Sequence, residues 1–109
     1  MPLKQKPTFP VSGRITVSGQ AVPGATVTLH AYNATTEKYA AVADGLTDAV
    51  GRFQITTYSR FDGAPSGEYV VTVTKSAAVP AVFTSTTTST LKLKIHETPN
   101  TLNLDLPGK

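Results

Sequence analysis

The residue types that most often do chemistry in proteins are sparse in this chain, and histidine is the first to consider. The chain has two histidines, His30 and His96. Apolar residues alternate with each of them, so strand parity predicts that both side chains point outward into solvent. A histidine that acts as a general base or holds a metal ion needs a second polar group converging on the same point. No sequence neighbour supplies one, and we therefore expect neither histidine to form a site.

Carboxylates are the next candidates. Asp44 and Asp48 bracket Gly45, and Asp62 and Glu68 follow further along the chain. A calcium ion takes several oxygen ligands from a tight loop. However, this spacing differs from the EF-hand pattern, and Asp48 has the position of a turn residue in Thr-Asp-x-x-Gly. Turn chemistry is the favoured interpretation, and a calcium ion near Asp44 and Asp48 stays open as the alternative.

Nucleophilic catalysis lacks its usual sequence signals. The chain has no cysteine, and no serine stands in a Gly-x-Ser-x-Gly elbow. The absence of cysteine also excludes disulfides and zinc–thiolate sites. The sequence therefore predicts no catalytic residue, no cofactor and no metal ion, and a protein that is not an enzyme.

Aromatic residues near the expected loops are the candidates for binding. Tyr32, Tyr58 and Phe61 flank loops, and aromatic side chains suit contact with a protein or a sugar. Tyr39 is expected to pack inward instead. Lys92 and Lys94 share parity with His96 and form a modest basic stripe, for which a solvated sheet face is favoured over an anion site.

Composition limits the class of protein. At 109 residues the chain has the length of one domain. Its net charge of +3, which several lysines near the termini largely explain, is too weak to predict binding to nucleic acid. No stretch is long and apolar enough for a membrane span. Residues 1–9 are expected to be a flexible leader, and residues 10–107 the folded domain.

Seven short segments alternate apolar and polar residues with period two, which indicates strands rather than helices. These segments span residues 11–17, 25–31, 39–43, 53–55, 69–73, 91–95 and 102–106. Turn residues separate them, notably Gly19-Gln20, Pro23-Gly24, the Asp48–Gly51 segment and Pro99-Asn100. This pattern predicts an all-β, seven-stranded antiparallel sandwich.

Three motifs give the chain a family resemblance. They are Val22-Pro23-Gly24-Ala25-Thr26-Val27, Thr47-Asp48-Ala49-Val50-Gly51-Arg52-Phe53 and Gly67-Glu68-Tyr69-Val70-Val71-Thr72-Val73. In order and spacing they resemble the carboxypeptidase regulatory-like domain, a transthyretin-like Greek-key β-sandwich. The resemblance covers about residues 10 to 106. It is strongest to the form found in small bacterial exported lipoproteins, through Pro10-Val11-Ser12-Gly13-Arg14-Ile15 and the Pro80–Phe83 stretch.

The resemblance implies an exported module of the bacterial cell envelope, in the periplasm or on the cell surface. The chain has no cysteine to carry a lipid, so an anchor is implied only for a longer precursor. We expect a monomeric, non-enzymatic structural or interaction module whose partner is an envelope protein or a glycan. The alternative is a carbohydrate-binding module, which predicts at least two exposed aromatic rings in one plane.

Overall fold

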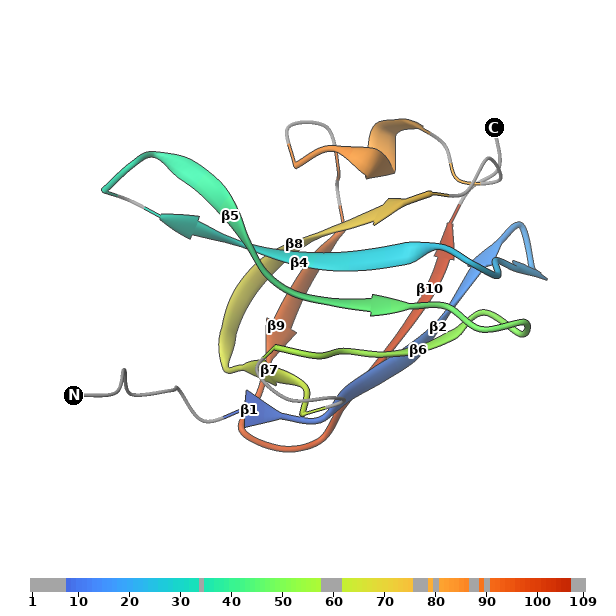
Figure 1. Ribbon diagram of the computed structural model, residues 1–109, viewed down its shortest axis with the longest axis horizontal. Helices are drawn as coiled ribbons and strands as arrows, with labels where there is room; N and C mark the ends of the chain where they lie inside the picture. The colour runs from blue at the N-terminus through green and yellow to red at the C-terminus, as the bar shows by residue number, and fades with distance from the viewer. Residues whose placement is uncertain are drawn as a thin grey trace.

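The fold is built almost entirely from strands (Figure 1). The computed structural model describes residues 8–33, 35–57, 62–75, 79, 81–86, 89 and 91–106. The strands in these ranges are β1 (Thr8–Phe9), β2 (Val11–Val17), β3 (Gln20–Ala21), β4 (Thr26–Asn33), β5 (Lys38–Leu46), β6 (Arg52–Gln54), β7 (Ala64–Pro65), β8 (Gly67–Thr74), β9 (Lys92–Ile95) and β10 (Asn100–Leu106). A single 3-10 turn, η1 (Ala81–Thr84), is described between β8 and β9.

Two four-stranded sheets enclose one core. In the first, β2 pairs with β10 on one side and with β3 and β6 on the other; in the second the order is β5-β4-β8-β9. The short strands β1 and β7 pair separately. On one side of the molecule the sheets are joined where the amides and carbonyls of Asp44 in β5 and Thr56 after β6 exchange hydrogen bonds. The arrangement is an all-β, sandwich-like fold.

Each of the seven predicted strands has a counterpart at the predicted place. The prediction missed the two-residue strands β1, β3 and β7, and β1 lies within the expected leader. It was also wrong about direction in one case, because β10 runs parallel to β2 over seven residue pairs from Asn100↔Val11 to Leu106↔Val17. The turn after β9 carries the chain into the opposite sheet, so β10 does not form a hairpin with the strand that precedes it.

Two motifs that look like separate turns in the sequence form a single unit. The hydroxyl of Thr47 accepts a hydrogen bond from the Ala25 amide at 2.8 Å, and the backbones of the same residues bond through Thr47 N–H and Ala25 C=O at 2.9 Å. The amide of Gly24 donates to the Thr47 carbonyl at 3.1 Å. Thr47 is buried, so its polar groups need these partners. The start of β4 is thereby fastened to the end of β5.

The core follows the predicted alternation. The residues that no solvent reaches include Ile15 and Ile55 near the first sheet, and Leu29, Val71 and Val73 in the second. β8 is buried on both faces, because Val70 and Thr72 on its outer face are buried as well as Val71 and Val73 on its inner face. The turn η1 packs against β8, and in Figure 1 it lies on the side of β8 away from β4.

A β-bulge changes the parity of the hairpin between β4 and β5. Leu29 pairs with Ala43, but the next residue, His30, pairs with Ala41, so Val42 is an extra residue. Every side chain of β5 before the bulge therefore faces opposite to simple alternation. Tyr39, expected to pack inward, is instead 43% exposed. That prediction was wrong because nothing in the local sequence marks the extra residue.

Candidate functional site

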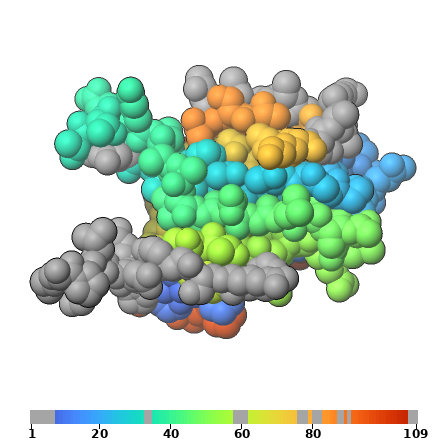
Figure 2. Space-filling model, viewed as in Figure 1, coloured from blue at the N-terminus to red at the C-terminus, as the bar shows by residue number. Residues whose placement is uncertain are grey.

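The predicted contact residue Tyr32 lies on the exposed end of β4, where it is 55% exposed. It pairs across the strands with Tyr39 of β5. Tyr58 and Phe61, the other two predicted contact residues, lie outside the described residues. The hairpin that carries the tyrosine pair projects from the body of the molecule (Figures 1 and 2). An exposed aromatic pair on a projecting hairpin is well placed to meet a partner.

The two tyrosines border a groove, here called the tyrosine groove, on the outer face of the second sheet. The ring centroids lie 5.3 Å apart with an interplanar angle of 64°, an edge-to-face contact. The groove has a volume of about 400 Å³. It runs across β5, β4, β8 and β9 and is lined by Tyr32, Tyr39, Glu68, Tyr69, Val70, Lys92, Leu93 and Lys94.

The far side of the tyrosine groove is charged. Lys92 and Lys94 are exposed on the edge strand β9, where they pair with Val70 and Glu68 of β8. The predicted basic stripe is therefore present as two lysines facing one acidic residue. His96 is exposed just beyond β9 but does not line the groove. The groove combines aromatic surface at one end with separate positive and negative charges at the other.

His30 is not the freely solvated residue that parity predicts. It lies on the outer face of the second sheet, is partly buried, and its Nε2 lies 2.8 Å from the Thr72 hydroxyl. Partial burial lowers the pKa of His30 from its ordinary value of 6.5 because desolvation disfavours the charged ring. His96 is exposed, as predicted. The ring of His30 is held by a structural contact rather than aimed into a cleft.

Two of the four candidate carboxylates, those of Asp48 and Asp62, accept backbone amides in turns and loops. The Asp48 Oδ1 accepts hydrogen bonds from the Val50 and Arg52 amides, both at 2.9 Å. These two bonds lower the pKa of Asp48, with smaller contributions from nearby arginines. The Asp62 Oδ1 likewise accepts the Thr57 amide at 2.8 Å. Within the described ranges, no three histidine or acidic side chains gather closely enough to hold a metal ion.

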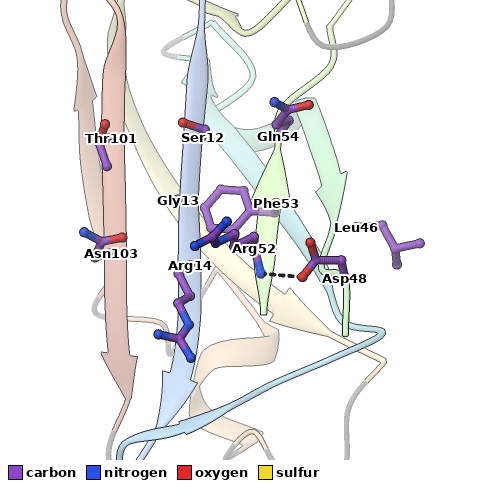
Figure 3. A pocket seen from close by; sticks show the side chains of 10 residues that line it. All are labelled: Ser12, Gly13, Arg14, Leu46, Asp48, Arg52, Phe53, Gln54, Thr101 and Asn103. Carbon is purple, nitrogen blue, oxygen red and sulfur yellow. Dashed lines mark hydrogen bonds between the residues drawn. The ribbon is translucent and has the colours of Figure 1, made fainter. Parts of the chain in front are cut away.

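A second polar depression lies on the outer face of the first sheet, and sequence reasoning did not single it out (Figure 3). Arg14 of β2 and Arg52 of β6 pair directly across the strands there. Period-two alternation indicates that each arginine faces outward, but only the strand register shows that they are neighbours. Strands β3, β4 and β5 lie between the two residues in the sequence, so no local pattern joins them.

Comparison with known proteins informs the fold alone. No protein-family model matches the sequence, and no curated protein does. The crystal structure of a DUF3823 family protein from Parabacteroides merdae ATCC 43184 is similar, with a TM-score of 0.61 and 15% identity over 96% of this chain. The chain spans about half that structure, 47% of its length. At this identity the likeness supports a shared all-β fold and carries no activity with it.

A second solved structure is more distant. A 9R-lipoxygenase from Cyanothece PCC8801 aligns with 95% of this chain and 18% of its own, at a TM-score of 0.49 and 15% identity. Among the residues that the structure describes, no helix has the length and apolar character to cross a bilayer.

Proposed function

We propose that this domain is a non-enzymatic interaction module of an exported bacterial envelope protein, and that it receives a segment of a partner protein in the tyrosine groove. The observation that carries the proposal is the exposed Tyr32–Tyr39 pair beside the charged edge strand β9. Aromatic residues supply contact area at low entropic cost. Lys92 and Lys94 favour a partner segment with acidic side chains next to apolar or aromatic ones.

The uses of the reactive residues support a non-enzymatic role. The ring of His30 contacts Thr72, and the Asp48 carboxylate holds a turn. Export, and a lipid anchor on a longer precursor, remain proposals that rest on the family resemblance. The three sequence motifs that carry this resemblance also support our proposal that the longer strands follow the transthyretin-like Greek key of the carboxypeptidase regulatory-like domain.

Carbohydrate binding is the alternative, and the tyrosine geometry favours it less. A flat sugar ring stacks best on aromatic rings that share a plane, whereas Tyr32 and Tyr39 are inclined by 64°. A groove between inclined rings suits a side chain inserted edge-on. The protein-segment hypothesis is therefore the one we put forward.

Selection from a random peptide library tests the proposal. We expect the wild-type protein to enrich peptides that combine acidic and aromatic residues. Their affinity should fall at least tenfold in a Tyr32→Ser/Tyr39→Ser variant. The matched control is Leu46→Ser/Val50→Ser, which removes two side chains of similar exposure, 66% and 49%, away from the groove.

Equal binding of the selected peptides to the tyrosine variant and the wild type would overturn the proposal. A glycan array provides the second arm of the experiment. Glycan binding that disappears in the tyrosine variant, without any peptide enrichment, would replace the proposal with the carbohydrate alternative.

A further inference from the structure

The polar depression on the first sheet is a second candidate site, on different strands from the tyrosine groove. We call it the arginine face and define it by the outward side chains of three adjacent strands. They form two cross-strand rows, Thr101–Ser12–Gln54 and Asn103–Arg14–Arg52, from β10, β2 and β6. Figure 3 shows these side chains standing over the three strands. The depression measures about 650 Å³, larger than the tyrosine groove.

Gly13 contributes to the hollow between the two rows. It lines the depression together with its strand partner Phe53, which is buried. A Cβ atom at Gly13 would lie 1.7 Å from the Leu102 carbonyl oxygen and 3.0 Å from the Phe53 Cζ. Glycine is therefore required for β10 and the Phe53 ring to approach β2 this closely. Gly13 has no side chain, so the depression lies between polar and charged side chains of the two rows.

The charge of the arginine face is unbalanced. Arg14 and Arg52 are directly opposite each other, and like charges in such a cross-strand pair disfavour folding. Within the part of the chain that the structure describes, neither guanidinium forms an ion pair. The one carboxylate that lines the depression, Asp48, uses its Oδ1 to accept the amides of Val50 and Arg52. Two arginines thus line the depression together with one carboxylate, whose Oδ1 the adjoining turn already uses.

The guanidinium of Arg14 is also held in position. Its Nε donates a hydrogen bond to the Val50 carbonyl oxygen at 2.9 Å. This bond fixes the guanidinium plane and leaves its terminal nitrogens for a ligand. A planar guanidinium matches the two oxygens of a carboxylate, phosphate or sulfate group, which a flexible ammonium group does less well.

We propose that the arginine face binds an oxyanion, with Arg14 and Arg52 as its cationic ligands and the Asn103 amide beside them in the same row. The hydroxyls of Ser12 and Thr101 and the amide of Gln54 extend the site with neutral donors and acceptors. The oxyanion belongs to a small ligand that also carries hydroxyl groups. A bound anion relieves the repulsion between the two arginines. This proposal is independent of the one made for the tyrosine groove.

Titration by NMR tests the site with defined probes. Sodium sulfate, sodium phosphate, sodium acetate, galacturonate and neutral galactose are added to the ¹⁵N-labelled protein, with ionic strength held constant by sodium chloride. We expect saturable shifts of the Ser12, Arg14, Arg52 and Asn103 amides with at least one anion and none with galactose. Preference for sulfate and phosphate would identify a tetrahedral oxyanion, and preference for galacturonate a carboxylate on a hydroxylated ligand.

Substitutions distinguish a specific binding site from a general effect of net charge. Arg14→Gln and Arg52→Gln should each weaken binding at least tenfold, and Arg14→Lys/Arg52→Lys should weaken it severalfold although the charge is kept. The control, Lys92→Gln/Lys94→Gln, removes two positive charges from the other sheet and should change affinity less than twofold. Thermal melting confirms that each variant is folded.

Two results would overturn the proposal. The first is a shift that grows linearly with every anion and never saturates in the wild-type protein. The second is an equal loss of binding in the lysine control and the arginine variants, since that result would assign the effect to net charge.

Discussion

At the scale of single residues, several polar side chains hold turns and strand ends in place. Asp48 closes a turn through its Oδ1, and Asp105 does the same for the hairpin after β2 by accepting the Thr16 hydroxyl and the Gly19 amide. The Tyr69 hydroxyl donates to the Pro65 carbonyl at 2.7 Å within the buried part of the molecule. Polar groups of this kind keep loops and strand ends in place because their backbone partners would otherwise lack a hydrogen bond.

The pH dependence of His30 provides a test at this scale. Its pKa in the folded state lies below 6.5, so the unfolded chain binds this proton more tightly than the folded one. Protonation therefore favours unfolding, and His30 lowers the free energy of unfolding as the pH falls through 6.5 toward the folded pKa. We expect an NMR titration midpoint for the His30 ring below 6.5, and a smaller loss of thermal stability between pH 7.5 and 5 in His30→Gln than in the wild type. A midpoint at or above 6.5 would contradict this.

At the scale of elements, the turns are the part of the fold that rests most directly on local residue chemistry. Gly51 closes the Asp48 turn with φ +82°, and Gly19 closes the hairpin after β2 with φ +83°. The two glycines have nearly the same φ and differ in how close neighbouring atoms lie to them. A Cβ atom at Gly51 would lie 2.5 Å from the Ile15 carbonyl oxygen, whereas one at Gly19 would have no heavy atom within 4 Å.

The matched substitutions Gly19→Ala and Gly51→Ala separate backbone strain from steric conflict. We expect Gly19→Ala to lower the free energy of unfolding by about 1 kcal/mol, the cost of a left-handed non-glycine residue. Gly51→Ala should cost about 3 kcal/mol or more, because it adds a clash with the backbone of β2. Urea denaturation measures both. Equal losses would show that the Ile15 carbonyl does not confine Gly51.

The same scale explains what the sequence could predict and what it could not. Turns and strands are local, so Asp48, Gly51 and the alternation of β2 and β8 were readable from neighbouring residues. The bulge at Val42 has no signal in the neighbouring residues. It turns Tyr39 outward, where Tyr39 pairs with Tyr32. Tyr32 was predicted as a contact residue beside a loop, and it is exposed. The position of Tyr39 next to it depended on a parity change that only strand pairing reveals.

The arginine face was even less predictable from the sequence than the tyrosine groove. Arg14 and Arg52 each stand in an alternating segment, so their outward direction follows from parity. Their proximity depends on the antiparallel register of β2 with β6, and that of Asn103 depends on the parallel register with β10. Register between strands distant in sequence is set by burial across the whole sandwich, so neither neighbour relation has a local signature.

At the scale of the whole molecule, both sheets share one core, so they should unfold together. Leu29 in the second sheet is fully buried in the same hydrophobic cluster as Ile15 in the first. Leu29→Ala should lower the free energy of unfolding by about 3 kcal/mol through lost burial and a residual cavity.

Amide hydrogen exchange can locate that loss, since the Ile15 amide donates to the Gly51 carbonyl and the Val71 amide to the Leu91 carbonyl, both at 2.8 Å. If the domain is one cooperative unit, Leu29→Ala lowers the opening free energy of both amides equally. Leu46→Ala, at a residue 66% exposed, should leave both unchanged. A loss confined to Val71 would mean that the second sheet opens alone, and that the face opposite the arginines can rearrange without disturbing them.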